Sequence, residues 1–158
     1  MARPKSDIEP RIVHAARARF LTHGVDGASL RGIAKDAGTS IGMIYYYFPT
    51  KDELFMAVVE EIYHEFLGDL AEALDPSLTS EERVHRVSVR VSQMSDDEAD
   101  VIRLVVREAL TSSSRRDGLL ERFSRGHLPL IAATIRDGIV RGELDSRHSP
   151  VVMTIVTF

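Results

Sequence analysis

Apolar residues recur at spacings of three and four along almost the whole chain, and no long stretch alternates apolar and polar residues with a period of two. The first spacing is that of one face of an α-helix, whereas strict alternation is that of a half-buried strand. The pattern therefore predicts an all-α protein of about eight helices with short connections.

Helix starts are indicated by a serine or threonine followed three residues later by glutamate, a pattern in which hydroxyl and carboxylate satisfy backbone N–H groups. Breaks are expected where glycine, proline and serine occur. The pattern predicts a long fourth helix near residues 51–74, a sixth near 98–111, a seventh near 119–141 that is interrupted or restarted at Pro129, and an eighth from Pro150. The sixth is apolar almost all round and is expected at the centre of a second domain. The capping pattern occurs at Ser6–Glu9, Thr50–Glu53, Thr79–Glu82 and Ser95–Glu98, and the breaks at 24–27, Gly38, Pro49, Pro76, 112–118 and 142–150.

The first fifty residues predict a helix-turn-helix. A first helix carries Ile12, Ala16 and Phe20 on one face; a second begins at Ser29 and ends at Gly38, where glycine permits a sharp turn. A third, from Thr39 or Ser40, must end at Phe48 because a residue before proline is pushed out of helical geometry. We expect a DNA-binding domain over residues 1–50, residues 51–74 as a connector, and a helical regulatory and dimerisation domain over 51–158.

Aromatic residues are concentrated in the predicted third helix. Residues 39–51 read TSIGMIYYYFPTK. A helical wheel places Ile41, Ile44, Tyr45 and Phe48 on the packing face, so Tyr46 and Tyr47 are expected to be exposed. Exposed tyrosine can donate to a phosphate and lay its ring against a sugar or a thymine methyl group. The alternative is that these aromatics fill the joint between two domains.

The segment ASLRGIAKDAGTSIGMIYYYFPTKDELF resembles the DNA-binding region of the tetracycline-repressor (TetR) family, and the similarity extends from Ile8 to about Val59. Positions 41 and 43, often polar in that family, are Ile and Met here, so base reading should depend on apolar contacts with thymine methyls and on Arg31. The wheel and the resemblance disagree over Ile41 and Tyr45, and our expectation follows the resemblance. The resemblance implies base contacts by Arg31, Ile41, Gly42, Met43 and Tyr45, and phosphate contacts by Ser29, Ser40, Tyr46, Tyr47 and Lys51.

Beyond residue 60 the resemblance is one of pattern only. It implies a homodimer built on the last helices, a pseudo-palindromic operator in double-stranded DNA, and repression relieved by a small molecule, although an activator of the same architecture stays open. Because the apolar run from Pro150 stops at Phe158, the chain is expected to lack part of its C-terminal dimerisation region. An apolar or aromatic effector is expected among Phe66, Met94, Phe123, His127 and Ile131, unless these residues simply fill a core.

The net charge of the chain is negative, but the first fifty residues are basic. The chain of 158 residues has a net charge of −4, but residues 1–50 carry seven Lys and Arg against four Asp and Glu. Such asymmetry suits a small part that meets an anion. The rival interpretation is a helical sensor or interaction module whose basic face contacts protein or membrane, yet a membrane-surface helix would be longer and more basic.

The sequence contains no pattern typical of a disulfide, a metal site or an enzyme active site. The chain has no cysteine, no histidine pair spaced to hold a metal on one helix, and no phosphate loop or catalytic motif. We therefore expect no metal, no cofactor and no enzymatic activity. A polar N-terminus and the lack of a long apolar run favour a cytoplasmic protein without a membrane partner.

Overall fold

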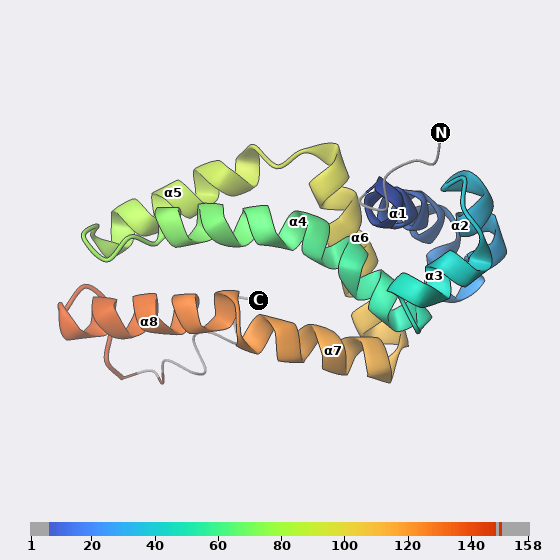
Figure 1. Ribbon diagram of the computed structural model, residues 1–158. Coiled ribbons are helices and arrows are strands. Elements are labelled where there is room, and N and C mark those ends of the chain that lie inside the picture. Colours follow the sequence, from blue (N-terminus) through green and yellow to red (C-terminus); the bar gives the residue numbers. More distant parts are fainter. Residues whose placement is uncertain (1–6, 148, 150–158) are drawn as a thin grey trace. The chain divides into compact units, whose positions relative to one another are not determined.

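The computed structural model describes residues 7–147 and 149, and this part of the chain consists of helices without strands (Figure 1). The all-α prediction is therefore confirmed. The helices are α1 (Ile8–Gly27), α2 (Leu30–Asp36), α3 (Ile41–Tyr47), α4 (Lys51–Ala73), α5 (Ser80–Ser92), α6 (Asp96–Thr111), α7 (Ser113–Ser124) and α8 (His127–Val140).

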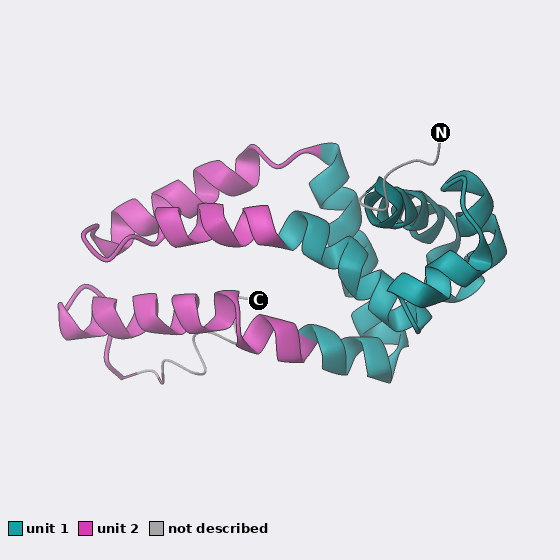
Figure 2. Ribbon diagram, viewed as in Figure 1, with its two compact units in different colours: residues 1–63, 96–119 teal, residues 64–95, 120–158 magenta. Residues whose placement is uncertain are grey.

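The chain divides into two compact units, each assembled from two separate segments (Figure 2). The first unit comprises residues 1–63 and 96–119, and the second comprises residues 64–95 and 120–158. The first unit thus holds α1 to α3, the beginning of α4, all of α6 and the first part of α7. This division does not follow the boundary at residue 50 that the sequence suggested.

The core of the first unit includes the face of α1 that the apolar spacing predicted and one face of α4. Ile12, Ala16 and Phe20 of α1 are fully buried, and so are Leu54 and Val58 of α4. Each large apolar side chain buried in this way contributes roughly 1.5–3 kcal/mol. Burial along α1 and α4 therefore stabilises the unit in which α1 contacts α2 and α2 contacts α3.

Helix α6 differs from its prediction. It contacts α1 in the first unit and is not the centre of a second domain. Val101 and Leu104 are buried, whereas Val106 is 53% and Leu110 81% exposed. A helix that is apolar all round was expected to be buried all round, but only the side toward α1 is covered within the described residues.

The end of the chain also corrects two predicted boundaries. Helix α7 begins at Ser113, inside a run that was expected to be a break, and the following break lies at Arg125 and Gly126 rather than at Pro129. Pro129 lies in the first turn of α8, where a missing N–H removes no intrahelical hydrogen bond. The helix predicted from Pro150 lies outside the described residues.

Two of the predicted capping patterns form the expected hydrogen bonds in the structure. Thr79 and Glu82 cap each other at the start of α5, and the Thr50 hydroxyl accepts a hydrogen bond from the Glu53 N–H at 3.1 Å. Ser6 lies outside the described residues, and α6 begins directly after Ser95. Local capping chemistry therefore marks these helix starts correctly from the sequence.

Candidate nucleic-acid interface

The turn between α2 and α3 is fixed by backbone geometry and by α1. Gly38 has φ of +61°, a conformation that strains any residue with a side chain. Thr39 N donates to the carbonyl of Ala34 at 2.9 Å, and the Arg11 guanidinium donates to the carbonyls of Ala37 and Gly38. The angle between the two short helices is therefore held from both sides.

Serine caps begin both short helices. The Ser29 hydroxyl accepts from the Gly32 N–H at 3.4 Å, and the Ser40 hydroxyl accepts from the Met43 N–H at 3.3 Å. Each hydroxyl still has its own hydrogen to donate. Both serines can therefore cap a helix and meet a phosphate at the same time.

Helix α3 has one buried and one exposed side. Ile44 and Phe48 are buried, whereas Tyr46 is 72%, Tyr45 51% and Ile41 37% exposed. The resemblance therefore placed Ile41 and Tyr45 better than the helical wheel, which had assigned both to the packing face. Gly42 is also exposed, and Met43 is half-buried.

Tyr47 is less exposed than predicted. Its side chain is half-buried, and its ring meets Tyr46 edge to face with a centroid distance of 5.2 Å. Its ring centroid lies 6.4 Å from that of Phe48. Packing between neighbouring aromatic rings thus covers a residue that the wheel placed in solvent.

The two predicted cationic contacts differ in their surroundings. Arg31 is exposed on α2, so its guanidinium can reach a base edge. Lys51 is half-buried, and its ammonium donates to the Asp26 carbonyl at 3.2 Å. An ammonium has three donors, so this bond leaves Lys51 able to contact a phosphate.

The start of α4 is a poor site for a DNA phosphate. Asp52 and Glu53 lie in its first turn, and Thr50 already caps the N–H of Glu53. Acidic side chains at a helix N-terminus complement the positive end of the helix dipole and repel a second anion. The acidic side chains therefore leave the N–H groups at the start of α4 poorly suited to bind a DNA phosphate.

Part of the basic charge of residues 1–50 is paired within the first unit. Arg17 lies 3.1 Å from Asp97 of α6, and Arg19 binds Asp36 at 2.6 Å. The hydrogen bond from Arg19 holds the pKa of Asp36 below its ordinary value. The candidate surface therefore depends on Arg31 and the tyrosines more than on a broad basic patch.

The candidate effector residues all belong to the second unit. Phe123 and His127 pack ring to ring with a centroid distance of 4.7 Å, and His127 is 5% exposed. Burial lowers the pKa of His127, and the nearby charge of Arg122 lowers it further. Phe66 packs instead against the Arg90 guanidinium at 5.8 Å, while Met94 and Ile131 are half-buried. The set of five stays a prediction.

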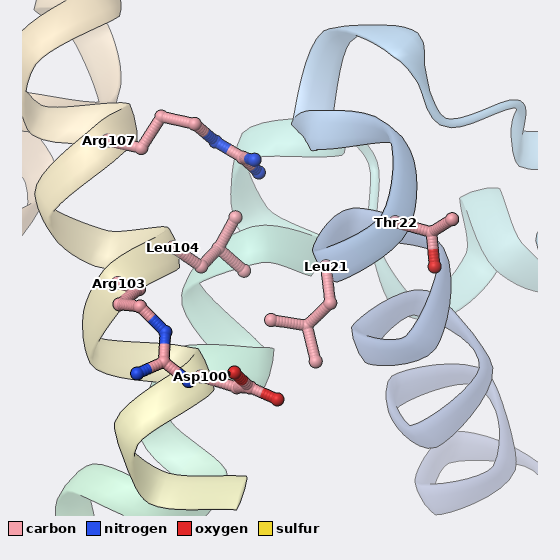
Figure 3. A pocket seen from close by; sticks show the side chains of 6 residues that line it. All are labelled: Leu21, Thr22, Asp100, Arg103, Leu104 and Arg107. Carbon is pink, nitrogen blue, oxygen red and sulfur yellow. Dashed lines mark hydrogen bonds and ion pairs between the residues drawn. The ribbon is translucent and has the colours of Figure 1, made fainter. Parts of the chain in front are cut away.

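A hollow that the sequence did not reveal lies between α1 and α6 in the first unit (Figure 3). It has a volume of about 430 Å³, and in Figure 3 the side chain of Leu21 on α1 lies opposite those of Arg103 and Leu104 on α6. Its lining comes from segments some eighty positions apart, so no local pattern could have shown it. The residues that line it are Leu21, Thr22, Asp100, Arg103, Leu104 and Arg107.

The described residues form neither a metal site nor a membrane-spanning helix. No three His, Cys, Asp or Glu side chains of this part gather closely enough to hold a metal ion. In the same part of the chain, each helix is too short or too polar to cross a membrane.

Two short helices about a glycine turn, with an exposed aromatic face on the second, define a helix-turn-helix DNA-binding regulator. Residues 12–58 match the family described as bacterial regulatory proteins, tetR family. This match identifies residues 12–58 as the DNA-binding segment of a TetR-family transcriptional regulator.

Relatives agree with this assignment. The chain is 27% identical over 138 residues to the uncharacterized HTH-type transcriptional regulator YhgD of Bacillus subtilis, covering 87% of this chain and 72% of that protein. It is 31% identical over 111 residues to an HTH-type transcriptional regulator of Mycobacterium tuberculosis strain H37Rv, covering 70% of this chain and only 42% of that protein. GusR of Salmonella enterica shares the fold with a TM-score of 0.77 at 18% identity, over 99% of this chain and 80% of GusR.

Proposed function

We propose that this regulator represses transcription by binding a pseudo-palindromic operator as a homodimer, and that a small apolar or aromatic molecule releases it. The observation that carries the proposal is the exposed side of α3, where Tyr46 is 72% and Tyr45 51% exposed beside the uncovered Gly42. Large aromatic side chains left uncovered on a short helix mark a surface that meets a partner. Operator binding also implies a cytoplasmic protein that acts by binding and not by catalysis.

In this proposal the first turns of α3 enter the major groove. Ile41, Met43 and Tyr45 contact thymine methyl groups and base edges, Gly42 lets the groove edge approach closely, and Arg31 donates to a guanine. Phosphate contacts position the protein on the duplex and carry no sequence information. These contacts are assigned to Ser29, Ser40, Tyr46, Tyr47 and Lys51.

The test of DNA recognition is selection from a random pool of duplexes, followed by affinity measurements on the selected and a scrambled duplex at one salt concentration. A specific regulator prefers its site by about 10³-fold or more. Equal affinities for the two duplexes would reject the proposal. Binding to vesicles of anionic lipid, without any DNA preference, would favour the rival sensor or interaction module.

The effector is proposed to bind among Phe66, Met94, Phe123, His127 and Ile131. The lowered pKa of His127 supports an uncharged ligand, because a neutral imidazole offers no cation to an acidic group. Coupling between two sites is reciprocal. Calorimetric titration of a candidate effector should therefore give weaker binding with operator present than without it, and equal affinities would exclude that molecule as the inducer.

A further inference from the structure

The guanidinium of Arg115, in the first turn of α7, joins three carboxylates of the first unit. Its Nη1 donates to Asp26 Oδ1 at 3.1 Å and to Asp52 Oδ1 at 3.0 Å. Its Nη2 donates to Asp26 Oδ2 at 2.9 Å and lies 2.9 Å from Glu108 Oε2. The Arg115 side chain is only 5% exposed. A buried arginine with this many charged partners holds a fixed geometry.

Two of these partners bracket the helix-turn-helix. Asp26 lies in the last turn of α1 and Asp52 in the first turn of α4, so α2, the glycine turn and α3 all lie between them in the chain. One side chain therefore ties together the two ends of the segment that reads DNA. The Lys51 ammonium adds a second link, since it donates to the Asp26 carbonyl at 3.2 Å.

The third partner, Glu108, lies at the kink of α1 that precedes the helix-turn-helix. Helix α1 is interrupted at Gly24, whose φ of 73° and ψ of 166° are not helical. Glu108 accepts a hydrogen bond from Val25 N at 3.4 Å, and Arg107 donates to the Phe20 carbonyl at 3.0 Å. The last turn of α1, which carries Asp26, is thus positioned from α6.

The positive charge of Arg115 offsets the negative charges of the three carboxylates around it. Its hydrogen bond lowers the pKa of Asp26. Burial lowers the pKa of the Arg115 guanidinium itself, but the hydrogen bonds to Asp26 and Asp52 and the charge of Glu108 together raise it above its ordinary value. Without the arginine, three carboxylates would face one another and repel. The two ends of the reading segment would then keep the bond from Lys51 to the Asp26 carbonyl but lose the bridge from Asp26 to Asp52 through Arg115.

We infer that Arg115 is a positioning residue for operator recognition, which sets the pose of α3 by clamping both ends of the helix-turn-helix. The inference rests on the proposed function. Sequence preference comes from base contacts, which depend on the pose of α3, whereas phosphate contacts carry no sequence information. Loss of the clamp should therefore reduce affinity for the selected duplex far more than affinity for a scrambled one.

The first test compares Arg115→Lys with Arg116→Lys. Both keep the net charge, but a lysine cannot reproduce the planar fork that reaches Asp26 and Asp52 together. Arg116 is the matched control because its side chain is 51% exposed and pairs only loosely with Asp117, at 3.6 Å. We expect Arg115→Lys to weaken binding to the selected duplex by about tenfold or more while changing binding to the scrambled duplex by less than about twofold. Arg116→Lys should bind both as the wild type does.

The second test, Asp26→Asn, separates the clamp from simple electrostatics. The Asp26 side chain is 83% exposed, and Arg115 keeps Asp52 and Glu108, so this variant should fold even where Arg115→Lys does not. Removing a negative charge near DNA would, by charge alone, tighten binding to both duplexes. The clamp predicts the opposite sign for the selected duplex, whose affinity should fall.

The outcomes are distinct. If the wild type shows no sequence preference, the proposed function fails. If the wild type has a preference and Asp26→Asn keeps or tightens it, the clamp inference is overturned. A thermal unfolding midpoint that falls for Arg115→Lys with an unchanged ratio of the two affinities would likewise overturn it, because that result shows a structural role only.

Discussion

Gly42→Ala is the substitution whose effects on folding and on DNA binding should have opposite signs. Gly42 lies in α3, and a Cβ added there would have Ser40 Oγ, at 3.8 Å, as its nearest neighbour. That distance is ordinary van der Waals contact, so the new methyl group meets no obstacle within the protein. The unbound variant should therefore tolerate the change well.

The magnitudes follow from helix propensity and from overpacking. Glycine in a helix is about 0.5–1 kcal/mol less favourable than alanine, so the free energy of unfolding should rise by roughly that amount. Against a groove edge in close contact, an added methyl group costs about 1–3 kcal/mol. Operator affinity should thus fall by roughly fivefold to a hundredfold.

Urea unfolding and fluorescence anisotropy with a labelled operator measure the two effects. Gly38→Ala is the control, because φ of +61° and an Arg11 Nη2 atom 2.7 Å from the new Cβ make that position intolerant. It should lose stability and DNA binding together. If Gly42→Ala binds operator as tightly as the wild type, Gly42 does not lie against the groove, and the docking of α3 must be revised.

Further predictions concern the base contacts, the oligomer and the pH dependence. Arg31→Ala should relax base preference at a cost of about 1–3 kcal/mol, whereas Lys51→Ala should weaken all sequences alike and reduce the salt dependence, both measured by anisotropy on a panel of duplexes. Unchanged affinity and salt dependence for Lys51→Ala would contradict its phosphate contact. The protein should be a dimer at micromolar concentration by light scattering, and a monomer would refute the operator symmetry. Because burial lowers the folded pKa of His127, its neutral form contributes stability above its unfolded pKa of about 6.5, and that stability should fall as the pH decreases through this value. Urea unfolding at about pH 7.5 and about pH 5.5 should show a smaller difference for His127→Phe than for the wild type, and an equal difference would assign the loss to other groups.

The sequence predicted correctly those helix ends and turns that depend on residues close together in the chain. The Thr79 cap, the end of α3 at Phe48 and the turn at Gly38 each depend on residues close in sequence, and all three are present in the structure. The family resemblance placed Tyr45 on the exposed side of α3, where periodicity alone had failed. For a helix of two turns, the wheel cannot distinguish the edge of the buried arc from the surface.

The features that could not be predicted from the sequence are contacts between segments distant along the chain. Arg115 stands in a run of serines and arginines that was expected to be a break, and nothing near it indicates that Asp26 and Asp52 are its partners. Helix α6 looked like the centre of a second domain because its apolar content was counted without knowing which side α1 covers. Burial of Leu104 and exposure of Leu110 follow from that packing, and not from composition.

The two-segment construction of the first unit bears on how the protein folds as it is synthesised. Residues 1–63 leave the ribosome before residues 96–119, which complete the unit. Contacts between parts far apart in sequence form late, since the intervening loop must close first. The nascent helix-turn-helix is therefore without the Arg115 side chain until about three quarters of this chain has been made. A polypeptide that ends after α4 would carry every residue assigned to DNA and still lack the side chain that joins Asp26 to Asp52, so premature termination should yield fragments that compete poorly for the operator.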